Sequence, residues 1–219
     1  MAANPAFESP ISVMPDGPLT GADAWRADEL RERDDWIHTL SSAEIAEVDA
    51  AIDQYEASGR PIADLTPETF SLPTLGPRLE RIREDLLRGR GFVLMRGLPV
   101  VRYSPGQRAT AYFGIGAYLG RAVSQNAMGH LLGHVIDIGR DNADHTARTY
   151  QTRDRQFFHS DSCDIVGLLC VRKAKSGGLS AIVSSVTLYN EMLKRSPELT
   201  RELFQPIYFD RRGEVPVGK

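Results

Sequence analysis

The sequence has little cysteine, little excess charge and no long apolar run, and each shortage excludes a class of protein. Its two cysteines, Cys163 and Cys170, are too few for a disulfide framework in 219 residues. A formal net charge of −3 argues against a nucleic-acid partner or electrostatic binding to a membrane. No apolar run approaches the roughly 18 residues of a membrane span, and the first residues lack the basic and apolar regions of a signal peptide. We therefore expect a reduced, cytoplasmic protein.

What the chain does contain is an ordinary globular composition, with 42% hydrophobic and 25% charged residues. This length is enough for one sizeable hydrophobic core. Residues 1–20 are rich in Pro, Ala and Ser, which is typical of a flexible lead-in. Residues 21–88 are expected to form an N-terminal helical region. Its first part, residues 22–40, is predicted to be a charged helical stretch that carries both tryptophans.

Three further helices are predicted from their end signals. Ser41 and Glu44 have capping-box spacing and start a helix that ends at the glycine in position 59. A second helix begins near Pro77 and stops at a glycine in position 89 or 91. A third begins at Ser104, with proline in its first turn, and runs to position 120. The apolar residues expected on the buried faces of the first two helices are Ile45, Val48, Ile52, Tyr55, Leu79, Ile82, Leu86 and Leu87.

Beyond the second helix the hydrophobic pattern becomes that of strands. Residues 91–97, "GFVLMRG", predict a short buried strand between glycines, and residues 130–139 predict another. Residues 164–174 and 179–185 flank the turn "KSGG" and predict a hairpin.

The last part of the chain returns to helices before a final strand. A helix is expected over residues 185–194, followed by a short one capped by Ser196 and Pro197, and by a strand over 206–212. An order of helices first, then strands with helical inserts, predicts an α+β domain built on an antiparallel barrel or sandwich. We place this domain at residues 89–219.

The stretch "QFFHSDSCD", residues 156–164, contains two metal-ligand side chains one residue apart. On an extended chain His159 and Asp161 point to the same face. An imidazole beside a carboxylate supplies two members of the 2-His-1-carboxylate triad, which binds Fe(II) and leaves coordination positions open. The triplet is short, however, and the alternative is a surface strand that happens to carry these residues.

The surroundings of this triplet resemble a known family. "FHSD" at 158–161, followed by "GLLCVRKAKSGGLSAIVSS" at 167–185, is similar to the TauD/TfdA (taurine dioxygenase-like, clavaminate synthase-like) dioxygenases. In that family an H-[TS]-D segment precedes a hairpin ending in G-G-x-[TS]. The resemblance covers roughly residues 89–215. It implies a double-stranded β-helix (jelly roll) with Fe(II) at the barrel mouth and 2-oxoglutarate as co-substrate.

The resemblance also implies roles for individual residues. His159 and Asp161 match the first two iron ligands, and Ser180 matches a hydroxyl that helps hold a carboxylate of 2-oxoglutarate. The family usually has threonine at that position, often as G-G-D-T, so "GGLS" keeps the hydroxyl but departs from the pattern. Gly177 and Gly178 are expected to serve the turn itself through positive φ.

The family's second histidine ligand, and an arginine that pairs with 2-oxoglutarate, lie well C-terminal to the H-x-D motif. This chain has no histidine after His159. We therefore expect the sequence to stop before the barrel closes, with the third iron ligand and the arginine absent and the 219-residue chain inactive by itself. His130, His134 and His145 remain alternatives for the third ligand, although structural or solvent-exposed roles are favoured for all three.

Other polar residues near the motif have simpler interpretations. Four arginines between positions 140 and 155 are interleaved with aspartates, which favours a solvated, charge-balanced loop over an anion-steering surface. Gln125 and Asn126 are candidates for lining the pocket. Cys163 is a candidate for the metal side or for a small core residue.

Together these features predict a non-haem Fe(II)- and 2-oxoglutarate-dependent dioxygenase. It would hydroxylate a small organic substrate with O₂ and convert 2-oxoglutarate to succinate. One alternative is a jelly-roll binding protein without catalysis, and a second is a zinc-dependent hydrolase that uses an upstream histidine. The sequence leaves homo-oligomerisation open.

Overall fold

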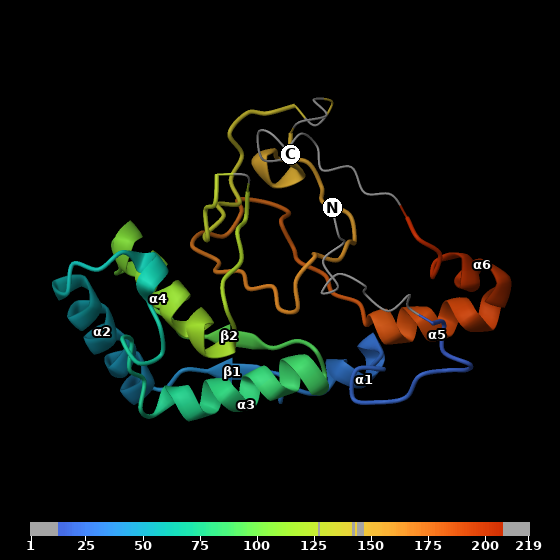
Figure 1. Ribbon diagram of the computed structural model, residues 1–219, viewed down its shortest axis with the longest axis horizontal. Helices are drawn as coiled ribbons and strands as arrows, with labels where there is room; N and C mark the ends of the chain where they lie inside the picture. The colour runs from blue at the N-terminus through green and yellow to red at the C-terminus, as the bar shows by residue number, and fades with distance from the viewer. Residues whose placement is uncertain (1–12, 127, 142, 144–146, 208–219) are drawn as a thin grey trace, which may run out of the picture. The chain divides into compact units, whose positions relative to one another are not determined.

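The computed structural model describes residues 13–126, 128–141, 143 and 147–207 (Figure 1). This part of the chain forms two compact units. Residues 13–33 and 181–207 make up the first unit, and the described residues of 34–180 make up the second. Most of the regular secondary structure in both units is helical, and the described residues contain one two-stranded sheet. The structure therefore agrees with a mixed helix-and-sheet class.

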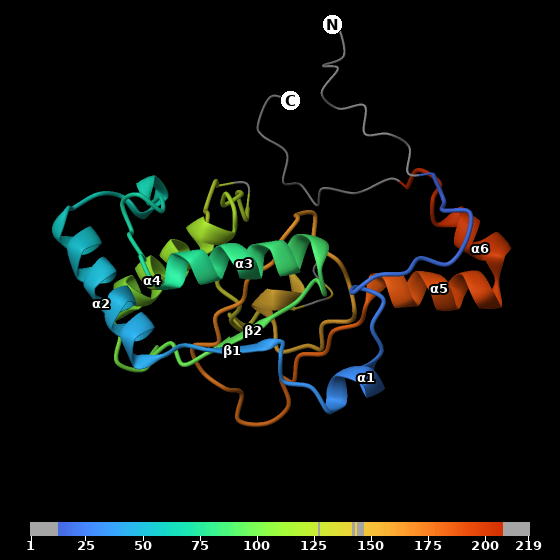
Figure 2. The same ribbon diagram turned by 90° about the horizontal axis from the view of Figure 1, so that it is seen from below.

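Three helices hold the core of the second unit. Helix α4 (Pro105–Leu119) packs against both α2 (Ser42–Ala57) and α3 (Leu75–Arg88), as Figures 1 and 2 show. The largest fully buried side chains are all apolar except Thr200 of the first unit; those in the second unit are Val48, Ile52, Phe70, Leu72, Leu75 and Leu79. This burial of apolar surface is the main source of stability for the unit.

Two of these helices begin where their capping signals predicted. The Ser41 hydroxyl accepts a hydrogen bond from the Glu44 backbone N–H over 3.2 Å, and the Glu44 carboxylate accepts one from the Ser41 N–H over 2.8 Å. Ser104 and Gln107 form the same reciprocal box at the start of α4. Each box satisfies N–H groups that the first turn of a helix leaves without partners.

Helix α3 begins at Leu75, two positions before the predicted Pro77, and ends as predicted at a cap formed by Gly89. The prediction that Leu87 lies on the buried face of this helix is wrong, because its side chain is 42% exposed, whereas Leu79 and Ile82 are buried. Leu87 directly follows Leu86, so the helical period turns it away from the core.

Strand β2 (Leu94–Arg96) confirms a strand within the predicted range 91–97, but the predicted burial is wrong, since Leu94 is 37% exposed and Arg96 is exposed as well. The strand pairs in parallel with β1 (Ile37–Thr39), with His38 opposite Met95. The predicted helical stretch at 22–40 is wrong except for α1 (Ala27–Arg31). The Leu94 N–H donates to the Trp36 carbonyl over 2.9 Å. Because sheet pairing occupies this backbone group, the segment cannot continue as a helix.

The strands predicted at 130–139 and in the hairpin at 164–185 are wrong, because the described residues there form no strand. Two sheet-like hydrogen bonds do occur, from Ile136 and Ile138 to the carbonyls of Tyr150 and Gln151. The latter two residues belong to the 3₁₀ turn η3 (Thr149–Gln151); another such turn, η2, spans Ile62–Asp64. The jelly roll is thus not confirmed.

The side chains of these segments explain why strands are absent. Leu168 is 76% exposed and Leu179 is 95% exposed, so neither covers a hydrophobic face. An isolated strand pair is marginal in water and needs further strands or a packed helix to become stable. These segments have the sequence pattern of strands but no such cover among the described residues.

The first unit combines α1 and two further helices with an extended N-terminal segment. The predicted helices are confirmed as α5 (Ser185–Arg195) and α6 (Pro197–Glu202). Asn190 on α5 hydrogen-bonds both the N–H and the carbonyl of Leu19, each over 2.8 Å, and Glu191 pairs with Arg26.

The strand predicted at 206–212 lies outside the described residues except for its first two positions, which form no strand. Among the helices that the structure describes, none has both the length and the apolar character to cross a membrane.

Candidate metal site

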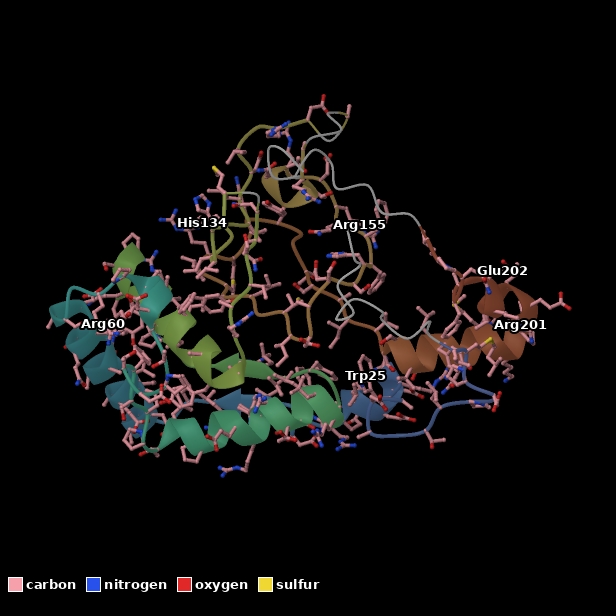
Figure 3. All side chains as sticks on the ribbon, in the orientation of Figure 1. Trp25, Arg60, His134, Arg155, Arg201 and Glu202 are labelled. Atoms are coloured by element: carbon pink, nitrogen blue, oxygen red, sulfur yellow. The ribbon has the colours of Figure 1, made fainter. Side chains whose placement is uncertain are left out.

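The predicted ligand pair lies in an irregular segment of the second unit. Figure 3 labels two residues of this irregular region, His134 and Arg155. The His159 and Asp161 side chains are 47% and 52% exposed, and His159 Nε2 lies 3.9 Å from Asp161 Oδ1. Side chains at i and i+2 therefore lie close together, although the backbone forms no strand.

This separation is compatible with one metal ion. First-row metals bind imidazole nitrogen and carboxylate oxygen at about 2.1 Å, so two donors to one ion lie at most about 4.2 Å apart. A nitrogen and a carboxylate oxygen are also the donor types of non-haem iron sites. The pair has the donor types of an iron site, as two of three protein ligands. A facial site places neighbouring donors at about 90°, or about 3.0 Å apart, so the two side chains must approach by roughly 0.9 Å to bind one ion together.

The hydrogen bonds of His159 determine which ring nitrogen is available. Nδ1 lies 2.8 Å from the carbonyl oxygen of Phe157. A carbonyl only accepts, so Nδ1 carries the hydrogen and Nε2 of the neutral ring carries a lone pair. Metal-binding histidines usually donate their other ring N–H in this way, often to a backbone carbonyl. Nε2, the nitrogen nearer Asp161, is therefore the one prepared for a metal.

A third donor is not assembled among the described residues, where no group of three His, Cys, Asp or Glu side chains could hold a metal ion. His130 instead pairs through Nδ1 with the Asn126 side-chain amide over 3.0 Å. His134 is equally outside any such group, and His145 lies outside the described residues.

The proposed co-substrate residue lies in a glycine turn. Gly177 and Gly178 have φ of 69° and 66°, as expected for positions that need positive φ. Ser180 is exposed, and its hydroxyl has no hydrogen bond within the part of the chain that the structure describes. That hydroxyl is free to bind a ligand. Ser180 is a candidate because it matches the family motif.

Gln125 and Asn126, the candidate pocket residues, form a local hydrogen-bonded turn. The Asn126 side-chain oxygen accepts from the N–H groups of Met128 and His130, and the Gln125 N–H donates to the His130 carbonyl. Their polar groups are thus largely used within residues 123–130. Cys163 is exposed and its thiol contacts the Ile165 carbonyl, so it is not a core residue.

Two features next to the ligand pair were not anticipated from the sequence. The Arg155 guanidinium lies over the Phe157 ring, 5.6 Å from its centroid, so at least this arginine of the loop packs on an aromatic ring. The Gln156 side-chain amide nitrogen lies 3.1 Å from His159 Nε2. An i, i+3 spacing has no special meaning outside a helix, so no sequence signal could have identified this contact.

A separate hollow of about 300 Å³ contains none of the predicted site residues and is lined by Asp35, His38, Arg78, Arg81, Ile82 and Asp85. Burial, together with the nearby Arg78, lowers the pKa of His38. Arg78 itself is paired with Glu44 over 3.0 Å. The charged groups around the hollow largely balance each other, so it shows no preference for an anion or a cation.

Comparison with known proteins identifies the class. Residues 58–216 match the family described as "Taurine catabolism dioxygenase TauD, TfdA family". By its description this is a family of dioxygenases, and that is the class of protein to which the chain is similar. More specifically, the chain belongs to the TauD/TfdA family.

Two curated relatives support this assignment. The chain is 30% identical over 203 residues to FR-33289 synthase of Streptomyces rubellomurinus, an alignment that covers 92% of this chain and 60% of the relative. It is 30% identical over 205 residues to the taurine hydroxylase-like protein SAT17 of Stachybotrys chartarum, covering 89% of this chain and 52% of the relative. The chain thus spans between about half and two thirds of the length of these relatives.

Proposed function

We propose that the protein is a non-haem Fe(II)- and 2-oxoglutarate-dependent dioxygenase that oxidises a small organic substrate. The observation that carries this proposal is the placement of His159 Nε2 and Asp161 Oδ1 3.9 Å apart, in a chain that belongs to the TauD/TfdA family. When bound, iron and 2-oxoglutarate supply oxidation of a substrate C–H bond by O₂, coupled to decarboxylation of 2-oxoglutarate to succinate.

Each residue then has a distinct part. His159 holds the metal through Nε2 while the Phe157 carbonyl fixes the orientation of its ring, and Asp161 contributes a negatively charged oxygen. Ser180 donates its hydroxyl to a carboxylate of 2-oxoglutarate. Neither His159 nor Asp161 transfers protons in this scheme, because both serve as ligands.

We further propose that residues 89–219 form the N-terminal part of the family's jelly roll. Support comes from the apolar side chains of the irregular region, since Ile138, Leu168 and Leu179 are all more than half exposed. Such side chains are normally covered, and large exposed apolar areas mark surfaces that pack against something else. The two relatives are also longer than this chain by a large fraction of their length.

We propose hydroxylation of a small molecule as the reaction, because one of the relatives is named as a taurine hydroxylase-like protein. The test is whether the complete protein forms succinate from 2-oxoglutarate only with Fe(II) and O₂, and whether His159→Ala abolishes this. A zinc-dependent hydrolase would need neither O₂ nor 2-oxoglutarate, and a non-catalytic binding protein would form no succinate.

A further inference from the structure

The ring nitrogen that faces Asp161 already has a hydrogen-bond partner. His159 Nε2 lies 3.1 Å from the side-chain amide nitrogen of Gln156 and 3.9 Å from Asp161 Oδ1. Gln156 is itself exposed, so this contact is not enforced by burial in a core.

The direction of this hydrogen bond follows from the other side of the ring. Because Nδ1 donates to the Phe157 carbonyl, Nε2 of the neutral ring can only accept. The Gln156 amide group therefore donates to the Nε2 lone pair. One lone pair cannot accept a hydrogen bond and bind a metal ion together, so any metal at Nε2 must displace Gln156.

We propose that the Gln156 side chain competes with the metal for the lone pair of His159 Nε2. This inference rests on the proposed function for the assignment of His159 as a ligand. The Phe157 carbonyl fixes the tautomer without help from Gln156. Gln156 therefore adds competition rather than preorganisation, and its removal strengthens metal binding.

A carboxylate at the same position has a second effect. Glutamate is nearly the same size as glutamine but cannot donate to Nε2 at neutral pH, and its oxygens are metal ligands. Because the described residues supply two donors where a facial site needs three, Gln156→Glu adds a third donor beside the existing pair, a carboxylate oxygen in place of the triad's second imidazole.

The experiment measures Co(II) affinity and the state of the His159 ring in the 219-residue chain. At pH 8, ¹⁵N NMR of the metal-free chain should show His159 as the Nδ1–H tautomer in wild type and in Gln156→Ala, with the Nε2 resonance shifted by loss of its donor. Co(II) should bind Gln156→Ala about two- to tenfold more tightly than wild type, the range expected for one neutral hydrogen bond. Gln156→Glu should bind about tenfold more tightly or better.

Gln54→Ala is the matched control, because Gln54 is an exposed glutamine of α2 without a contact to His159. It should leave the Co(II) affinity and the His159 resonances unchanged. Unaltered affinity and unaltered His159 Nε2 resonance in Gln156→Ala would overturn the proposal. The experiment also separates failure of this proposal from failure of the proposed function. If His159 is not a metal ligand, His159→Ala leaves the Co(II) affinity unchanged.

Discussion

Glu47 on α2 caps the first turn of α3: its carboxylate accepts a hydrogen bond from the backbone N–H of Leu75 over 2.8 Å, and a second from Thr74 over 2.7 Å. The Thr74 side chain itself makes no capping hydrogen bond. A residue 28 positions away in sequence thus satisfies two of the N–H groups that the start of a helix leaves without partners.

Glu47→Ala should therefore destabilise the second unit. Loss of a cap costs about 1–2 kcal/mol, and the negative charge near the positive end of the α3 dipole is lost as well. Urea unfolding followed by circular dichroism measures the effect. Asp53→Ala, at an exposed acidic position of the same helix, is the control and should change stability by no more than about 0.5 kcal/mol. Equal stability of the two variants would contradict the capping role.

Gly114→Ala should also destabilise the core. A Cβ at this position of α4 would lie 2.5 Å from two atoms of the Phe70 ring, which is fully buried and cannot move freely. Overpacking of this kind costs about 1–3 kcal/mol. The control is Gly116→Ala in the same helix, where a Cβ would meet nothing within 4 Å. Alanine at position 116 should stabilise the protein by about 0.5–1 kcal/mol. The midpoint of thermal unfolding should therefore fall in Gly114→Ala and rise in Gly116→Ala.

The stability of the second unit should fall at high pH because of Tyr103. Burial and the hydrogen bond to Asp49 raise the pKa of Tyr103 to about 12. Since the ordinary value is 10.0, the unfolded chain ionises first, and the stabilisation present below pH 10 is lost as pH rises towards 12. Tyr103→Phe should show a shallower loss over this window. An identical pH profile for wild type and variant would contradict the raised pKa.

The helices and their ends were the most predictable part of the fold, because their signals are local. Ser41 with Glu44, and Ser104 with Gln107, determine their helix starts through neighbours three residues away. The Glu47 cap of α3 could not be predicted, since it joins residues that only the fold brings together. For the same reason α3 begins before the predicted Pro77.

The strands were less predictable, because a strand forms only when a partner is present. Residues 37–39 pair with residues 94–96. Residues 130–139 and 164–185 have strand-like sequences, but their described residues form no strand. At the site, the i, i+2 spacing was enough to predict that His159 and Asp161 lie close together. The contact between Gln156 and His159 depends on the local path of the backbone, and no sequence pattern predicts it.

Ser180→Ala should weaken the use of 2-oxoglutarate without affecting metal binding. The proposed hydroxyl contact to a carboxylate is worth about one hydrogen bond, so the KM for 2-oxoglutarate in the complete protein should rise about three- to tenfold. Ser176→Ala, at an exposed serine of the same turn, is the matched control. An unchanged KM in Ser180→Ala, with iron content equal to that of wild type, would remove Ser180 from the site.

In the proposed function, His159 and Asp161 bind the iron of a 2-oxoglutarate-dependent dioxygenase. The most direct measurement is succinate formation by the complete protein, loaded with Fe(II) without O₂ and then exposed to O₂ and 2-oxoglutarate. Because both side chains are about half exposed, His159→Ala and Asp161→Ala should keep the circular dichroism spectrum of wild type. We predict that both lose bound iron and succinate formation, while His134→Ala retains both. Succinate formation at the wild-type rate in Asp161→Ala would contradict the claim.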